Sequence, residues 1–193
     1  MSTPVAHTIL VCGISGVGKT RLLNDVLKSL PSAVLWRASE IIGAARNVLD
    51  PETLRTLPAT EILRSQALLI RGFEALRRAF PNTLVLLDAH SVIDADTGYI
   101  EIPVEVVRRF VLSGILHVSD EPARILKRRI ADTERVRPVR SLVHLVEYQL
   151  RSRAACEGYS AALNVPLIEV RSGEVEASTR AIQAIIAASS RTG

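Results

Sequence analysis

The sequence predicts an α/β fold of three layers, in which a five-stranded parallel sheet is covered by helices on both faces. Five short apolar runs alternate along the chain with segments whose apolar residues recur at helical spacing. Strands and helices that alternate in this way need right-handed crossovers, which make the strands parallel and distribute the helices over the two faces. One run, T-L-V-L-L at residues 83–87, is apolar throughout, as is typical of a central strand buried on both faces.

The expected elements follow from these runs and from the residues that end them. The strands are expected at residues 8–12, 34–36, 83–87, 115–118 and 166–170. The helices are expected at residues 19–30, 39–49, 59–80, 104–112, 123–130, 141–163 and 175–188. Ser39 and Ser141 are expected to cap the helices that they begin, and residues 94–98 (D-A-D-T-G) to form a turn between short extended pieces.

Length and composition indicate one domain over residues 1–193. The chain is 48% hydrophobic and 23% charged, as in globular proteins and unlike disordered ones. Its apolar runs fall far short of the roughly 20 residues of a membrane span, and it begins without a signal-peptide pattern, so we expect a soluble, cytoplasmic protein. Cys12 and Cys156 form no C-x-x-C pair, which favours reduced, buried thiols over a disulfide or a zinc site.

The strongest functional signal is the octet G-I-S-G-V-G-K-T at residues 13–20, which follows an expected strand and opens an expected helix. In that context a G-x-x-x-x-G-K-[ST] pattern predicts a phosphate-binding loop (P-loop), because glycines let the backbone turn tightly and direct its N–H groups at phosphates. Lys19 would bridge the β- and γ-phosphates of ATP, and the Thr20 hydroxyl would bind Mg²⁺. The residues expected to bind ATP here are Gly13, Ser15, Gly16, Val17, Gly18, Lys19 and Thr20.

Acidic and basic residues further along the chain fit phosphoryl transfer. Asp88 ends the apolar run at residues 83–87, where a carboxylate can hold Mg²⁺ beside the loop, the alternative being a helix cap or a turn. Arginines are dense between positions 124 and 140, and charge over the phosphates is what the chemistry needs, so we interpret residues 131–140 as a mobile lid. The alternative is a solvated basic face or a nucleic-acid patch.

Together these features resemble the nucleoside monophosphate kinases, and most closely the short-lid, archaeal-type adenylate kinases. The resemblance spans nearly the whole chain. It rests on the octet, on D-A-H-S-V-I at residues 88–93, on T-G-Y at residues 97–99 and on D-E-P at residues 120–122. L-K-R followed by D-T-E-R-V-R, within residues 126–137, is similar to the lid of that family.

The resemblance implies strands in the order 2-3-1-4-5, a short mobile lid, and transfer of the γ-phosphoryl group of Mg-ATP to a nucleoside monophosphate. It implies that Asp88 supports the metal and faces the acceptor, and that Arg128 packs on the adenine or reaches its phosphates. The catalytic residues on the matching positions are Lys19, Asp88, Arg128, Arg135 and Arg137.

Two further groups of residues are implied to bind the nucleotides. Ser172 and Gly173 would contact the adenine of ATP through their backbone. The acceptor would lie in a helical part at residues 37–80, and the residues implied to contact it are Arg37, Ser39, Asp88 and His90.

The acceptor half departs from the family pattern. R-A-S-E stands at residues 37–40, where the family usually offers a glycine and an acidic or hydroxyl residue, and Asp94 stands where the archaeal-type kinases carry a basic residue. The acceptor therefore stays open between a nucleoside monophosphate such as AMP and another hydroxyl or phosphate group, including a nucleic-acid 5′ end. A third hypothesis is a nucleotide-binding regulatory or defence protein that hydrolyses ATP slowly.

Overall fold

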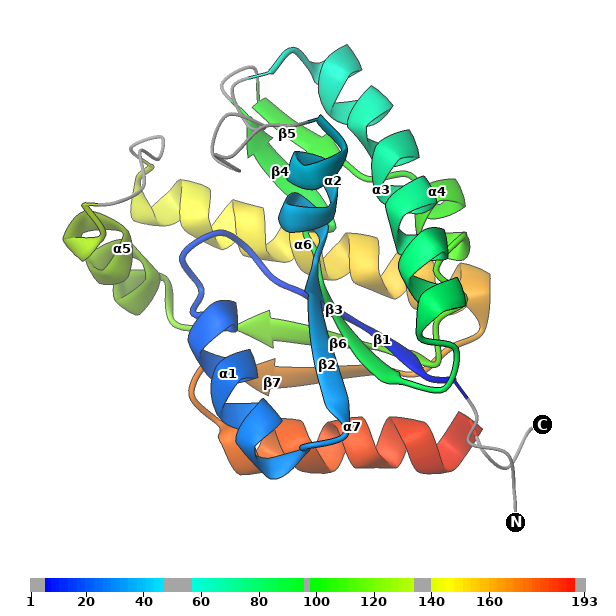
Figure 1. Ribbon diagram of the computed structural model, residues 1–193. Coiled ribbons are helices and arrows are strands. Elements are labelled where there is room, and N and C mark those ends of the chain that lie inside the picture. The colour runs from blue at the N-terminus through cyan, green and yellow to red at the C-terminus, as the bar shows by residue number, and fades with distance from the viewer. Residues whose placement is uncertain (1–5, 47–56, 96–97, 134–139, 190–193) are drawn as a thin grey trace.

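The computed structural model describes residues 6–46, 57–95, 98–133 and 140–189. Its centre is a parallel sheet of five strands in the order β2-β3-β1-β6-β7 (Figure 1). Because β4 and β5 pair only with each other, this is the expected order 2-3-1-4-5 among the strands of the sheet. The strands are β1 (Thr8–Cys12), β2 (Ala33–Arg37), β3 (Leu84–Asp88), β6 (Gly114–Ser119) and β7 (Leu167–Arg171).

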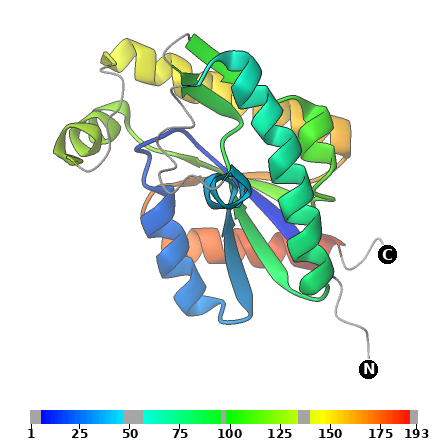
Figure 2. The ribbon, with the colours of Figure 1, turned by 45° about the horizontal axis from the view of Figure 1, so that its top comes forward.

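Helices cover both faces of the sheet, which confirms the three-layer prediction (Figure 1 and Figure 2). The connection from β1 to β2 runs in one direction across the sheet, whereas those from β2 to β3, β3 to β6 and β6 to β7 run in the other. Right-handed crossovers of opposite direction place their helices on opposite faces. One face carries α1 (Lys19–Ser29) and α7 (Val175–Ser189), and the other carries α3 (Ala59–Ala79), α4 (Val104–Arg108) and α6 (Leu142–Leu163).

Three further elements begin at the carboxyl ends of strands. They are α2 (Ala38–Arg46) after β2, the antiparallel hairpin of β4 (Val92–Ala95) and β5 (Gly98–Glu101) after β3, and α5 (Pro122–Ala131) after β6. Helix α2 packs on α3, where a Cβ added to Gly72 would lie 2.4 Å from Ile41 Cγ2. The missing side chain of Gly72 therefore allows the close approach of the two helices.

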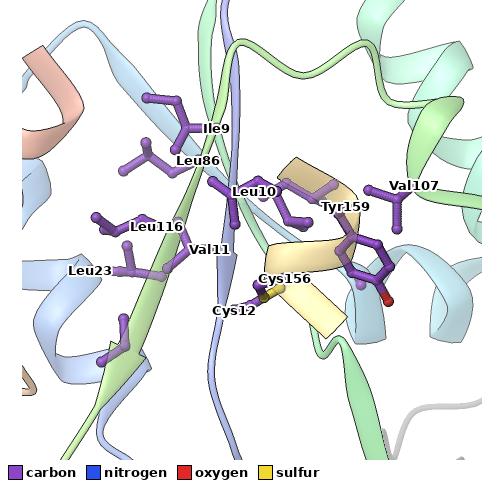
Figure 3. Close-up of a cluster of buried hydrophobic side chains, with 14 of the residues drawn as sticks. Ile9, Leu10, Val11, Cys12, Leu23, Leu86, Val107, Leu116, Cys156 and Tyr159 are labelled. Carbon is purple, nitrogen blue, oxygen red and sulfur yellow. The ribbon is translucent and has the colours of Figure 1, made fainter. Parts of the chain in front are cut away.

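The core is built on the alternation of side chains along β1, all of whose residues are buried. Figure 3 shows Ile9 and Val11 on one side of β1, where Leu23 of α1 lies, and Leu10 and Cys12 on the other. The second side packs against Val107 of α4 and against Cys156 and Tyr159 of α6. Both cysteines are buried free thiols, as expected.

Two local predictions about helix ends have different outcomes. Ser141 caps α6 as predicted, since its Oγ accepts a hydrogen bond from the His144 backbone N–H at 3.4 Å. The prediction that Ser39 caps a helix is wrong, because α2 begins at Ala38, directly after the last residue of β2. Ser39 thus lies inside the first turn. The end predicted for this helix, residues 47–49, lies outside the described residues.

The two short extended pieces predicted around residues 94–98 are present as β4 and β5, which pair as an antiparallel hairpin. The predicted turn is narrower than expected, since residues 94–95 and 98 belong to the strands and residues 96–97 lie outside the described residues. Asp94 lies within β4, where it faces Tyr99 of β5, and its carboxylate is buried between arginines. A run of two aspartates, a threonine and a glycine favours a turn only where the charged groups reach water. Helix α4 is likewise shorter than predicted and ends at Arg108. No helix in the described parts of the chain has both the length and the apolar character of a membrane span.

His117 of β6 is a buried polar residue in this core. Its Nε2 lies 3.2 Å from Ser152 Oγ of α6, and its side chain is 2% exposed. Burial, assisted by the positive charges of Lys19 and Arg153, lowers the pKa of His117 from 6.5 to about 4. The folded protein therefore holds His117 neutral at a pH where the unfolded chain protonates it.

We expect stability to fall as the pH drops from about 6.5 toward 4, because the unfolded state then binds a proton that the folded state excludes. The loss from His117 is about 2 to 3 kcal/mol between pH 7.5 and pH 4.5. Urea unfolding of the wild type and of His117→Gln across this range measures it. The advantage of the wild type over the variant should shrink by that amount, and a constant difference would contradict the prediction.

Candidate active site

The residues that the sequence singles out gather at one edge of the sheet. Parallel strands end at a common edge, and the register places Val11 and Arg37 opposite Asp88, and Cys12 opposite His117. The loop at residues 13–18 therefore begins beside the end of β3 and the end of β6. Ligands of open α/β sheets bind at this edge.

Glycines give this loop its shape. Gly18 has φ +104° and forms the N-terminal boundary of α1 in the left-handed region, which only glycine adopts readily. A Cβ added there would lie 2.3 Å from Ser172 Oγ, and one added to Gly16, at φ +82°, would lie 2.8 Å from Arg129 Cγ. Gly18 offers no side chain to cap α1, so the first N–H groups of this helix are directed at whatever anion the loop receives.

Lys19 and Asp88 meet at the centre of the edge. Lys19 Nζ donates a hydrogen bond to Gly13 O at 2.7 Å and lies 3.7 Å from Asp88 Oδ1. The two side chains are 6% and 14% exposed, so this ion pair is largely desolvated. A buried ammonium held beside a tight glycine loop, with a carboxylate next to it, is suited to holding phosphate oxygens and a hard cation.

His90 also contacts the loop. Its Nδ1 lies 3.0 Å from Gly13 O, and because a carbonyl oxygen can only accept, Nδ1 is the nitrogen that donates. Gly13 O thus receives hydrogen bonds from both Lys19 and His90. The sequence pointed to His90 as an acceptor-binding residue, whereas the structure brings it to the start of the phosphate loop.

Two consecutive arginines of α5 hold the loop from the other side. Arg128 Nη1 donates to Val17 O at 2.7 Å, and its guanidinium also pairs with Asp120. Arg129 Nε donates to Ser15 O at 3.1 Å, and its Nη2 lies 3.5 Å from Asp94 Oδ2. Both side chains therefore contact the loop, and the catalytic role predicted for Arg128 stays a prediction.

A cleft of about 850 Å³ extends from the loop to helices α2 and α3. Its loop end is lined by polar and charged residues, namely Ser15, Gly16, Gly18, Lys19, Thr20, Asp88, His90, Arg128 and Arg129. The end toward α2, α3 and α4 is mainly apolar and includes Ile42, Ile62, Leu69, Ile102, Val106, Val107 and Phe110. Arg37, Ser39, Glu40, Ser65 and Gln66 are among its polar residues on β2, α2 and α3.

The other predicted site residues lie around this cleft or outside the described part of the chain. Ser172 and Gly173 follow β7, and Ser172 lines a second hollow, of about 510 Å³, with Asp120 and Arg124. Arg135 and Arg137 belong to the range 134–139, which lies outside the described residues, so their predicted roles stay predictions.

The contacts of Asp94 were not predicted. Its carboxylate accepts hydrogen bonds from Arg140 Nη2 at 2.7 Å and Arg140 Nε at 3.1 Å, in addition to its pairing with Arg129. The one available hint was the unusual position of an acidic residue where related kinases carry a basic one.

Fold, loop and cleft together define a P-loop protein. A family profile described as "AAA domain" matches residues 12–146, which is more than half of the chain and contains the loop, Asp88 and both arginines of α5. The chain therefore belongs to this family.

Curated relatives extend over most of the chain. An adenylate kinase of Methanoculleus marisnigri is 26% identical over 161 residues, covering 79% of this chain and 82% of the relative. An adenylate kinase of Methanothermobacter thermautotrophicus is 26% identical over 187 residues, covering 92% of this chain and 98% of the relative. These matches confirm the resemblance to archaeal adenylate kinases and show a P-loop phosphotransferase, an enzyme of the kinase class.

Solved structures show the same fold. A shikimate kinase from Acinetobacter baumannii, solved in complex with shikimate, superposes with a TM-score of 0.54 at 14% identity. The superposition covers 96% of both chains. The α/β architecture of this chain is therefore that of known P-loop kinases.

We expect Gly18→Ala to destabilise the protein by about 1 to 3 kcal/mol, because alanine must adopt a left-handed conformation and meet Ser172 Oγ. Urea unfolding measures the change. Gly158→Ala is the matched control, since Gly158 lies within α6 and nothing lies within 4 Å of the added Cβ. This control should gain about 0.5 to 1 kcal/mol. Equal effects of the two substitutions would contradict the role given to Gly18.

Proposed function

We propose that the protein transfers the γ-phosphoryl group of Mg-ATP to a nucleoside monophosphate, and that AMP is the first acceptor to test. The observation that carries this proposal is the placement of Lys19 and Asp88 in one cleft, with the phosphate loop at one end and α2 and α3 at the other. The volume of about 850 Å³ lies within the range of small-molecule sites. The names of the curated relatives support the same acceptor class.

The residues of the loop fit ATP and Mg²⁺. The backbone turn at Gly16 and Gly18, the start of α1 and the ammonium of Lys19 form a cradle that a side chain on either glycine would fill. The Thr20 hydroxyl and the Asp88 carboxylate line the same cleft and are the hard oxygen donors that Mg²⁺ prefers. When bound, Mg²⁺ would neutralise charge on the β- and γ-phosphates.

The chain's own residues would act by positioning and by charge. Lys19 lies where it can hold the terminal phosphates, and its contact with Gly13 O keeps the ammonium against the loop. Asp88 lies between Lys19 and the acceptor end of the cleft, so it can orient the metal and the attacking oxygen without acting as a strong base. Arg128 fixes the loop through Val17 O. The second hollow, beside Ser172, would take the nucleoside of ATP.

The acceptor is assigned to the helical part at residues 37–80. Arg37, at the end of β2, is the cation nearest to α2 in the cleft lining, and its guanidinium pairs with Glu40 at 2.7 Å while staying 31% exposed. It is therefore accessible to the phosphate of an acceptor. Gln66 is buried in the same wall, where its Nε2 donates to Ile62 O at 3.0 Å. The assignment of residues 131–140 to a lid remains part of this proposal.

We expect Lys19→Ala to weaken ATP binding by about 10- to 100-fold, because it removes a charge-assisted hydrogen bond to phosphate. Calorimetric titration with a non-hydrolysable ATP analogue measures the affinity. Lys28→Ala is the matched control: Lys28 lies on the same helix, is exposed, and pairs with Asp25 at 2.6 Å. Unchanged affinity of Lys19→Ala, with the fold intact by circular dichroism, would refute the assignment of the loop.

We expect AMP, or another nucleoside monophosphate, to accelerate ATP consumption in a coupled assay that compares AMP, GMP, CMP, UMP and their deoxy forms. Arg37→Gln should then raise the KM for the acceptor about tenfold, because a charged contact to its phosphate is lost. Its effect on the affinity for ATP should be small. Arg64→Gln, which removes an exposed arginine of α3 paired with Glu61, is the control.

A second candidate acceptor is an alcohol with an apolar body. The predominance of isoleucine, valine, leucine and phenylalanine at the α3 and α4 end of the cleft favours it. The same assay separates the two. A panel of nucleoside monophosphates that leaves ATP consumption unchanged would exclude the first proposal, and acceleration by alcohols with an apolar body would identify the second class.

A further inference from the structure

The environment of Asp94 is unusual for a residue in a short hairpin. Its side chain is 3% exposed and lies between two guanidinium groups, those of Arg129 in α5 and Arg140 just before α6. A carboxylate buried alone would be strongly unfavourable, and two arginines more than compensate its charge. The cluster formed by Asp94, Arg129 and Arg140 is here called the arginine clamp.

The clamp is fixed in place by the hairpin that bears Asp94. Tyr148 of α6 donates a hydrogen bond from its hydroxyl to Val92 O at 3.0 Å, and its ring stacks on Tyr99 with centroids 5.0 Å apart. Strand β4 is thereby attached to the long helix α6. Asp94 is therefore carried by a strand that is itself held against α6.

The clamp also contacts the phosphate loop. Arg129 is 5% exposed, its Nε donates to Ser15 O at 3.1 Å, and its aliphatic stem lies over Gly16. Arg129 lines the same cleft as Lys19. The orientation of its guanidinium is thus determined by Ser15 on one side and by Asp94 on the other.

We propose that Asp94 is a positioning residue for phosphoryl transfer: it holds Arg129 against the phosphate loop so that this guanidinium faces the terminal phosphate of a bound triphosphate. Arg140 donates two further hydrogen bonds to the buried carboxylate of Asp94 and so helps to balance its charge. Two carbonyl groups of the loop then hold cations in the cleft: Gly13 O accepts from Lys19, and Ser15 O accepts from Arg129. The inference rests on triphosphate binding by the loop and is independent of the acceptor.

The direction in which Asp94→Asn changes the affinity for ATP distinguishes a positioning role from a purely electrostatic one. Asp94→Asn removes a negative charge near the phosphates, which by Coulomb attraction alone would tighten the binding of every nucleotide. If Asp94 positions Arg129, the same substitution releases the guanidinium and weakens the contact that only a triphosphate makes. We therefore expect Asp94→Asn to bind a non-hydrolysable ATP analogue about tenfold or more weakly, with ADP affinity changed by less than about threefold.

Calorimetric titration of the full chain with the ATP analogue and with ADP measures the ratio of the two affinities. It requires neither turnover nor an acceptor. Asp94→Glu keeps the negative charge and should recover part of the preference for the ATP analogue over ADP. Arg140→Gln, at a side chain that is 25% exposed, perturbs the clamp without leaving Asp94 unpaired and should reduce the ratio in the same direction. These two variants carry the test if Asp94→Asn does not fold.

Ile182→Ala is the control for stability. Ile182 is fully buried in α7, on the opposite face of the sheet from the hairpin, so its truncation destabilises the fold without touching the clamp. It should leave both affinities unchanged well below its melting temperature. Tighter binding of the ATP analogue by Asp94→Asn, or an unchanged ratio in all clamp variants, would overturn the inference. If no acceptor accelerates ATP consumption but the clamp variants still change the ratio of the two affinities, only the proposed acceptor is rejected.

Discussion

The parallel pairing of β1 with β3 and β6 is the constraint on which the whole site depends. It brings the end of β1 beside Asp88 and His117, so the loop that follows Cys12 begins next to a carboxylate. Because β1 is buried along its entire length, this register cannot shift without moving the core on both faces of the sheet. The contact of 3.7 Å between Lys19 and Asp88 therefore follows from the pairing of the strands.

Much of this arrangement was predictable because it is local or periodic. The octet predicts its own conformation, and its glycines occupy positions where a Cβ would meet Val118 O, Arg129 or Ser172. The apolar run of β3 identified a central strand, and Asp88 marked its end. Alternating strands and helices then indicated a parallel sheet, and the resemblance to the nucleoside monophosphate kinases supplied the strand order that the structure has.

Other contacts depend on the placement of segments far apart in the chain, which no local pattern encodes. Asp94 looks like a turn residue in its sequence context, and only the approach of Arg140 and Arg129 from other elements explains its burial. Arg128 and Arg129 are indistinguishable as neighbours in a basic helix, yet they bond to different carbonyl groups of the loop. Ser39 was misplaced because nothing in the sequence shows that α2 follows β2 without a connecting loop.

The close packing of α2 on α3 at Gly72 has a consequence for how such a protein can diverge. These two helices form their own packing unit through Ile41 and Gly72, whereas the loop is held by α5, whose Arg129 also pairs with Asp94 of β4. One wall of the cleft can therefore be remodelled by exchanging side chains on the helix pair while the phosphate cradle keeps its geometry. The loop end of the cleft is thus constrained by backbone turns and by the two arginines of α5, whereas the opposite wall depends on helix side chains that can be exchanged.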